Sequence, residues 1–336
     1  ADVSIPIANG LNENTVNDII FMDDSTGYTM GAGGVVMYTN SAGDNWQVVQ
    51  EAAARIFEAS FPTEETAYAT TGSSLLKTNS GGEAWNFLSF PSEALFNYVV
   101  RIGFLDSLQG VALGFGNQYV KTEDGFESFE TGTLPETFFF SNKYVGARDN
   151  RIYIAGTTSN GFVNKLIYTD DLGASWTNVD IGLDGSFINN FHLLDDGTLI
   201  VQSDFDLIYS EDDGSSWNVI LNSATSLQNS VFLNSDTGYV FSSDDLSQGQ
   251  VRRIVDIQNP TIEAISIVPA LDSDFILGVL PIDGTTIYAY GYRRDGFEVL
   301  ASIWKSEDAG QTWNEEVVDL DLAGNIEQMK LTENSV

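Results

Sequence analysis

The chain has 336 residues, of which 43% are hydrophobic, and its 14 lysines and arginines are set against 48 aspartates and glutamates, a formal net charge of -34. This charge repels phosphate backbones and anionic lipid surfaces, so we expect no nucleic-acid partner. The absence of cysteine excludes disulfides, thiolate metal sites and cysteine nucleophiles.

No apolar run approaches the roughly 20 residues of a membrane helix, so we expect no direct membrane insertion. The hydrophobic runs are short and are broken by Asp, Asn, Ser and Gly. Together with 31 glycines and 12% aromatic residues, this pattern favours strands and tight turns. The sequence therefore predicts an all-β protein.

An octapeptide recurs along the chain, with the pattern Ser or Thr, any residue, Asp or a polar substitute, any residue, Gly, two more residues and an aromatic. The copies are TNSAGDNW (39–46), TNSGGEAW (78–85), TEDGFESF (122–129), TDDLGASW (169–176), SEDDGSSW (210–217) and SEDAGQTW (306–313). The third copy has its glycine displaced by one position and phenylalanine in place of tryptophan. The motif positions are Thr39, Gly43, Trp46, Thr78, Gly82, Trp85, Thr122, Asp124, Phe129, Thr169, Asp171, Gly173, Trp176, Ser210, Asp212, Gly214, Trp217, Ser306, Asp308, Gly310 and Trp313.

The spacing of the motif defines a longer repeat. Successive aromatic positions are 39, 44, 47 and 41 residues apart, and a gap of 96 residues then separates Trp217 from Trp313. One motif is missing in that gap, but SVFLNSDTGYVFSS from Ser230 aligns without gaps on IIFMDDSTGYTMGA from Ile19. The sequence therefore predicts seven units, at about 16–50, 54–90, 98–133, 140–181, 186–222, 228–268 and 274–320.

Each unit shows four short strands. In the first, fifth and seventh units the third strand is expected at 35–38, 207–209 and 302–305, ahead of the motif, and the tryptophan is expected to open the fourth strand. Four strands at a period in the forties are typical of a propeller blade. We predict one domain, 1–336, a seven-bladed β-propeller of four-stranded antiparallel blades. The strand-like stretches 3–7 and 326–331 lie outside the units, and one or both are expected to pair where the ring closes.

The repetition of the motif argues against a catalytic or metal-binding role. Asp212 and Ser210 can accept hydrogen bonds from backbone N–H groups of their own turn, and Gly214 can supply a positive φ. Ser41 and Ser80 stand where other copies have Asp, and serine is a poor metal ligand. We therefore expect a structural turn, with no metal and no cofactor.

These octapeptides resemble the Asp-box, or bacterial neuraminidase repeat, of sialidases, sortilin-type receptors and propeller glycoside hydrolases. The longer unit, with its D-x-x-x-G-Y and T-x-D-x-G-x-x-W elements, is most similar to photosystem II assembly factor-like propellers, over about residues 16–320. The resemblance implies that the box is structural and lies away from any active site. It also implies a chaperone-like contact with a membrane protein.

The residues give little support for an enzyme. A sialidase resemblance would imply an arginine in an Arg-Ile-Pro run before the first box, but Arg55 follows that box and lacks the proline. A propeller glycoside hydrolase, sialidase-like or endoglucanase-like, is the alternative function, because two of the 48 acids would suffice as a catalytic pair. His192 is the only histidine and is interpreted as structural.

Scarce basic residues are the candidates for binding. Arg252 and Arg253 lie in the sixth unit, which lacks a motif, and Tyr292, Arg293 and Arg294 lie in the seventh. Ion pairing with the acidic background is one interpretation of these residues, and a contact patch for a protein or glycan is the other. We expect a non-catalytic binding or scaffolding propeller that is secreted, periplasmic or at the cell surface.

Overall fold

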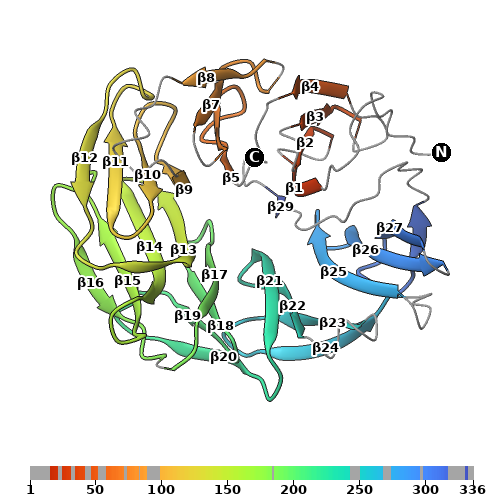
Figure 1. Ribbon diagram of the computed structural model, residues 1–336. Helices are drawn as coiled ribbons and strands as arrows, with labels where there is room; N and C mark the ends of the chain where they lie inside the picture. Colours follow the sequence, from red (N-terminus) through yellow and green to blue (C-terminus); the bar gives the residue numbers. More distant parts are fainter. Residues whose placement is uncertain are drawn as a thin grey trace. The chain divides into compact units, whose positions relative to one another are not determined.

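A computed structural model describes residues 16–21, 25–31, 35–41, 47–51, 58–71, 74–82, 84–88, 99–183, 185–242, 250–267, 274–295, 298–316 and 330–331. These residues form strands and turns and contain no helix, as the sequence predicts (Figure 1). Accordingly, this part of the chain contains no helix that could cross a membrane. The chain divides into two compact units, one of Ala1–Ile56 with Thr225–Val336 and the other of Phe57–Ala224.

The compact unit that contains both ends of the chain holds three of the sheets that the structure describes. Their strands are β1 (Val16–Phe21), β2 (Gly27–Gly31), β3 (Val35–Thr39) and β4 (Gln47–Glu51), then β21 (Leu227–Asn234), β22 (Thr237–Ser242), β23 (Gln250–Val255) and β24 (Thr261–Ser266), then β25 (Asp274–Pro281), β26 (Ile287–Asp295), β27 (Glu298–Ser306) and β28 (Asn314–Glu316). A further strand, β29 (Lys330–Leu331), pairs in parallel with β1.

The compact unit Phe57–Ala224 holds four sheets of four strands each. They are β5 (Glu58–Ser60), β6 (Ala67–Thr70), β7 (Leu75–Thr78) and β8 (Asn86–Leu88), then β9 (Val99–Phe104), β10 (Gly110–Gly114), β11 (Gln118–Thr122) and β12 (Glu130–Thr133), then β13 (Phe138–Arg148), β14 (Arg151–Thr158), β15 (Asn164–Thr169) and β16 (Thr177–Asp180), then β17 (Ile188–Leu193), β18 (Leu199–Ser203), β19 (Asp206–Ser210) and β20 (Asn218–Asn222).

Every sheet follows chain order with antiparallel neighbours, apart from the parallel strand β29. The second strands of these sheets are the most buried, because both of their faces pack against neighbouring sheets. All five residues of β10 and all five of β18 are buried, whereas three of the four residues of β16 are exposed. Side chains of β14 and β15 meet those of β18 and β19 in one core cluster, which includes Tyr153, Leu166 and Val201. Two-sided burial explains why apolar runs such as Leu199–Val201 dominate the second strands.

Within the compact unit Phe57–Ala224, polar side chains join the first strands of neighbouring sheets. Glu58 Oε2 accepts the Ile102 N–H at 3.0 Å, and the Arg101 guanidinium donates from Nε to the Lys143 carbonyl at 2.9 Å. The same guanidinium lies 5.3 Å from the centre of the Tyr144 ring. Tyr144 in turn donates its hydroxyl to a carbonyl on β17. The inner edges of four sheets are therefore connected by side chains as well as by packing.

Several expected elements differ in detail. The fourth strands β16 and β20 begin one residue after Trp176 and Trp217, so the tryptophan closes the turn and does not open the strand. The sixth unit forms a four-stranded sheet although it lacks the motif. There a shorter turn replaces the motif, with Asp256 at φ +56° accepting the Gln258 N–H at 3.0 Å. The stretch 3–7 lies outside the described residues.

Candidate functional site

The motif turn is held by its own hydroxyl and carboxylate, as in the fifth copy. Ser210 Oγ accepts the Gly214 N–H at 2.8 Å and donates to Asp212 Oδ1 at 2.8 Å. Asp212 also accepts the Ser216 N–H at 2.8 Å and the Ser216 hydroxyl at 2.7 Å. The bonds from Ser216, and then the one from Ser210, lower the pKa of Asp212. A carboxylate that is bonded in this way serves the turn.

Two consecutive left-handed residues follow the third motif position in the second, third, fourth, fifth and sixth copies. Asp213 and Gly214 have φ of +56° and +84°, whereas Gly125 and Phe126 of the third copy have +70° and +68°. Phe126 N–H donates to Thr122 Oγ1 at 2.8 Å, the same bond that Gly214 makes with Ser210. The displaced glycine of the third copy therefore leaves the backbone path unchanged, since one glycine relieves either left-handed position.

The turns of the third, fourth, fifth and sixth copies contact the preceding sheet. Tyr119 of β11 donates its hydroxyl to the Gly173 carbonyl at 2.9 Å, and Lys77 of β7 donates to the Gly125 carbonyl at 3.3 Å. A Cβ at Gly214 would lie 2.8 Å from Val179 Cγ1, and one at Gly310 would lie 2.8 Å from Ile265 Cγ2. The glycine is thus required by close packing between sheets as well as by its φ.

The predicted basic residues lie on β23 and β26. The side chains of Arg252 and Arg253 are half-buried, and Arg253 lies 3.9 Å from Glu263 in an ion pair. The backbones of Tyr292, Arg293 and Arg294 form part of β26, opposite Ala301, Leu300 and Val299 of β27. Their side chains lie outside the described part of the structure. The contact patch made of these five residues stays a prediction.

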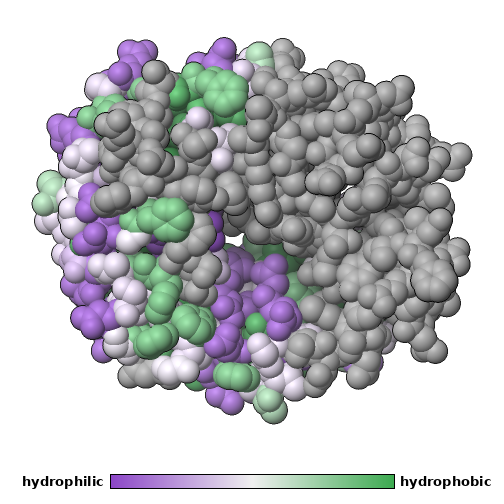
Figure 2. Space-filling view, in the orientation of Figure 1, coloured by the Kyte–Doolittle hydropathy of each residue, from purple (hydrophilic) through white to green (hydrophobic). Residues whose placement is uncertain are grey.

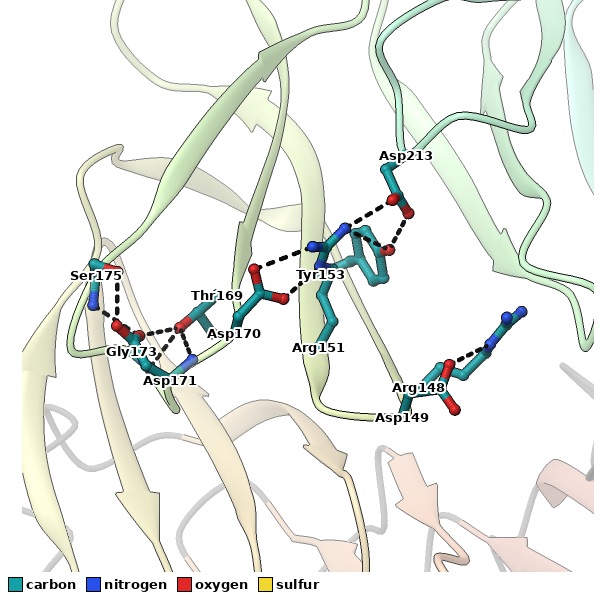
Figure 3. A network of polar contacts seen from close by, with 10 residues as sticks. All are labelled: Arg148, Asp149, Arg151, Tyr153, Thr169, Asp170, Asp171, Gly173, Ser175 and Asp213. Carbon is teal, nitrogen blue, oxygen red and sulfur yellow. Dashed lines mark hydrogen bonds and ion pairs between the residues drawn. The ribbon is translucent and has the colours of Figure 1, made fainter.

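A polar cleft opens where the β13–β14 turn meets two motif turns (Figure 3). Arg151 at the start of β14 binds Asp170 through two bonds, of 2.6 and 3.0 Å, and its Nη1 lies 2.9 Å from Asp213 Oδ2. Tyr153 donates its hydroxyl to Asp213 Oδ1 at 2.6 Å. The ring of Tyr168 lies 4.1 Å from the guanidinium carbon of Arg151. One arginine therefore joins the fourth and fifth motif turns.

The cleft has a volume of about 340 Å³, and two arginines and three aspartates line it. Arg148 donates to the Leu194 carbonyl at 2.8 Å and to the exposed Asp149 at 3.2 Å. The hydrogen bond to Asp170 raises the pKa of Arg151 further above its usual range, and burial raises the pKa of Tyr153 to about 12. Arg151 and Tyr153 therefore stay protonated near neutral pH and are not suited to proton transfer there.

Groups typical of metal sites are not clustered. Among the described residues no three His, Asp or Glu side chains lie close enough to bind a metal ion. His192 is half-buried in β17, where it pairs with Ile200 of β18. These positions match a structural histidine better than a catalytic one.

A row of exposed phenylalanines lies at the ends of three successive sheets, and we call Phe115, Phe162 and Phe205 the phenylalanine row. Each lies in the turn between the second and third strand of its sheet. Their exposed fractions are 38%, 54% and 45%, high values for large apolar side chains. Sequence reasoning missed these residues, although Phe at the same turn in three consecutive units was a readable signal.

Two further phenylalanines extend the apolar surface of the row. The Phe162 ring centre lies 5.2 Å from that of Phe139 and 6.0 Å from that of Phe187, and the Phe139 and Phe187 centres are 5.5 Å apart. The rings meet at tilted or edge-on angles between 42° and 76°. Over the described part of the face in view, Figure 2 shows green apolar groups set among purple polar ones.

The chain matches no known protein-family profile and no curated protein. Solved structures do resemble it. It is 10% identical to the RRP9 WD40 repeats, with a TM-score of 0.62 over 88% of this chain and 95% of that one. The fold is that of a β-propeller.

Other propeller-like structures are similar at the same low level of identity. YCF48 from Cyanidioschyzon merolae is 15% identical, with a TM-score of 0.52 over 95% of this chain and 89% of that one. The GH74 enzyme of Niastella koreensis is 14% identical, with a TM-score of 0.56 over 94% of this chain but 61% of that one. At these identities the similarity establishes the fold alone, because one fold carries many functions.

Proposed function

We propose that this chain is a non-catalytic binding or scaffolding module, a seven-bladed propeller that holds a protein or glycan partner at the cell envelope or surface. The phenylalanine row carries the proposal. Large apolar side chains exposed at the same turn of three successive sheets have no role in the core, and a contiguous apolar surface of this kind is typical of a binding site. The acidic composition and the resemblance to assembly-factor propellers support the envelope location.

The polar cleft favours binding over hydrolysis. A glycoside hydrolase needs one carboxylic acid that can donate a proton and one carboxylate that can act as a base or nucleophile. Asp170 and Asp213 both bind the Arg151 guanidinium, within 3.0 Å. Both carboxylates therefore hold two motif turns together, which favours a structural role for them over a catalytic one.

The test has a binding arm and a turnover arm. Purified protein is applied to a glycan array and to a peptide display library, alongside a variant with Phe115→Ser, Phe162→Ser and Phe205→Ser. We expect ligands that the wild-type protein retains and the variant loses, and no released sugar from polysaccharides or sialosides. Hydrolysis of any of these substrates, or a ligand set that the variant retains in full, would contradict the proposal.

The predicted arginine patch is a second candidate contact. A variant with Arg293→Ala and Arg294→Ala is compared with the phenylalanine variant on the same array and library. If the patch contributes, this variant loses carboxylate-bearing ligands selectively. Unchanged retention of those ligands assigns Arg293 and Arg294 to ion pairing within the acidic surface.

A further inference from the structure

Polar and ring contacts connect the turns of the phenylalanine row to neighbouring strands and sheets. Lys143 of β13 donates to the carbonyls of Gly114 and Gly116, on either side of Phe115. Ser159 N–H donates to the Thr137 carbonyl at 2.7 Å, which joins the turn of Phe162 to the loop before β13. Further along, Asp204 N–H donates to the Phe187 carbonyl at 3.2 Å, next to Phe205. The Lys143 bonds tie the Phe115 turn to the next sheet, and the ring contact of Phe162 with Phe187 connects the Phe162 turn to the sheet that carries Phe205.

The turns that carry the row are also fixed in place before any partner arrives. Asp204 Oδ2 accepts the Phe187 N–H at 3.0 Å, and its Oδ1 accepts from the Asn189 amide at 2.7 Å. Asp206 accepts from the Asn222 amide at 2.6 Å. A surface that is ordered in advance loses less conformational entropy on binding, so it can hold a short ligand.

Ring geometry favours apolar side chains over sugar faces. The rings of Phe139, Phe162 and Phe187 are inclined to one another, with two of the three pairs at 76° and 69°. Such a cluster presents ring edges and lacks a flat platform. Phenylalanine also has no polar group with which to hold a hydroxyl. Apolar side chains can pack against such a surface without a hydrogen-bonding partner.

Charge along the row is mostly negative. Asp204 and Asp206 flank Phe205, half-exposed Glu136 precedes the loop of Thr137, and exposed Asp180 ends β16. None of these four carboxylates makes an ion pair within the described part of the chain. On the same stretch, Lys165 lies opposite Asp180 in the sheet, and Lys143 is buried under the Phe115 turn. A partner with positive charge is attracted here, and one with negative charge is repelled.

The length of the row sets the length of the partner segment. Packed sheets lie about 10 Å apart, so three successive turns span about 20 Å. An extended chain of the polyproline II type advances about 3.1 Å per residue with about three residues per turn, and it covers that span with about six residues. Apolar side chains about three residues apart then lie on one side of the segment and meet successive turns.

We infer that the phenylalanine row binds an extended polypeptide segment of a partner protein, with apolar side chains about three residues apart and lysine or arginine beside them. This inference rests on the proposed binding function and names the partner's chemistry. Apolar side chains supply affinity through burial, and the flanking cations select against acidic segments.

Synthetic peptides of about twelve residues test the inference by fluorescence anisotropy. One has three leucines separated by serine pairs and lysines at both ends. A second has glutamate in place of lysine, a third has serine in place of leucine, and a neutral oligosaccharide forms the glycan arm. We expect the first to bind at least about tenfold more tightly than the others, and more weakly at high salt.

Variants locate the binding. Phe115→Ser, Phe162→Ser and Phe205→Ser together are expected to weaken binding of the first peptide about tenfold or more. The matched control replaces Phe87 and Val219, exposed by 56% and 61% on the outer strands β8 and β20, with serine, and should leave affinity unchanged. Equal thermal midpoints of the two variants exclude a folding defect as the cause.

Each outcome of these measurements tests either the inferred peptide partner or the proposed binding function. Equal binding of the lysine and glutamate peptides, or retention of the oligosaccharide alone through the row, overturns the inferred partner while the binding function stands. Failure of the row to retain any peptide or sugar overturns the binding function as well. Loss of binding in the Phe87 and Val219 control variant would also overturn the assignment to the row.

Discussion

At the residue scale, the motif varies in a way that its hydrogen bonds explain. Where its third position is Asp, as in Asp171 and Asp212, the seventh is a hydroxyl residue that donates to the carboxylate, Ser175 or Ser216. Where the third position is Ser80, the seventh is Ala84, and only the backbone bond from the Ala84 N–H to Ser80 Oγ remains, at 3.1 Å. Serine therefore keeps the turn of the second copy without the charge.

Glycine substitutions separate the cost of positive φ from the cost of close packing. Gly214 has a φ of +84° and a would-be Cβ only 2.8 Å from Val179, whereas Gly182 has a φ of +71° and no atom within 4 Å. We expect Gly182→Ala to destabilise the fold by about 1 kcal/mol and Gly214→Ala by about 2 to 4 kcal/mol, measured by chemical denaturation. Equal losses would mean that sheet packing does not constrain Gly214.

Buried Lys143 predicts a pH dependence of stability. Burial, with the nearby Arg101 charge adding to its effect, lowers the pKa of Lys143 from 10.5 to about 7. Between pH 7 and 10 the unfolded chain therefore binds a proton that the folded chain lacks, so the free energy of unfolding rises with pH. The expected rise is about 1.4 kcal/mol per pH unit.

The measurement compares wild-type protein with Lys143→Met in denaturant titrations from pH 7 to 9.5. The difference in free energy of unfolding between the two proteins should change with pH by the slope expected for one proton, about 1.4 kcal/mol per pH unit. The contributions of the surface charges that both proteins share cancel in this difference. Parallel curves for the two proteins would mean that Lys143 keeps an ordinary pKa. Above this range Tyr68, whose pKa burial raises to about 12, acts in the opposite direction.

At the element scale, the short strand β29 connects the C-terminal part of the chain to the first strand, β1. Lys330 and Leu331 pair in parallel with Ile20 and Phe21 of β1, so the last described strand is attached to the first. The stretch 326–331 was expected to pair where the ring closes; its last two residues do pair with β1, and closure of the ring stays a prediction. Backbone groups at the edge of β1 gain partners they would otherwise lack.

Truncation tests the contribution of β29. Removing residues 326–336 should lower the thermal midpoint by several degrees, because β1 loses the strand that pairs with its edge. Removing only 332–336 serves as the control and should change little. An unchanged midpoint for the longer deletion would show that β29 does not support the first sheet.

Periodicity predicted the elements well and the candidate site poorly. Strand positions follow from apolar runs and repeated turns, which is why even the sixth sheet was predicted without its motif. Arg151 escaped notice because its partners Asp170 and Asp213 occupy variable positions of the motif, and only the fold brings them together. Phe115, Phe162 and Phe205 were not predicted as binding residues, because a phenylalanine in a turn looks like a core residue until the strand boundaries around it are known.

At the scale of the whole molecule, a net charge of -34 works against compactness. Like charges repel most strongly at about 0.01 M salt, where the screening length is about 30 Å, and weakly at about 0.5 M. We expect the thermal midpoint to rise steadily with sodium chloride over this range. A flat or falling midpoint would mean that local ion pairs, such as that of Arg151, outweigh the global repulsion.

Motif turns such as those of Gly173 and Gly310 pack on the sheet before their own. The segment that folds cooperatively therefore does not coincide with the repeat seen in the sequence. Gly173 belongs to one sheet and contacts Tyr119 of the sheet before it, and Gly310 stands in the same relation to Ile265. The smallest piece with a complete interface therefore begins midway through one repeat and ends midway through the next. A duplication or deletion in the gene that respects the sequence repeat would cut through every such interface at its border, so new copies succeed only when the turn and its receiving sheet remain compatible as a pair.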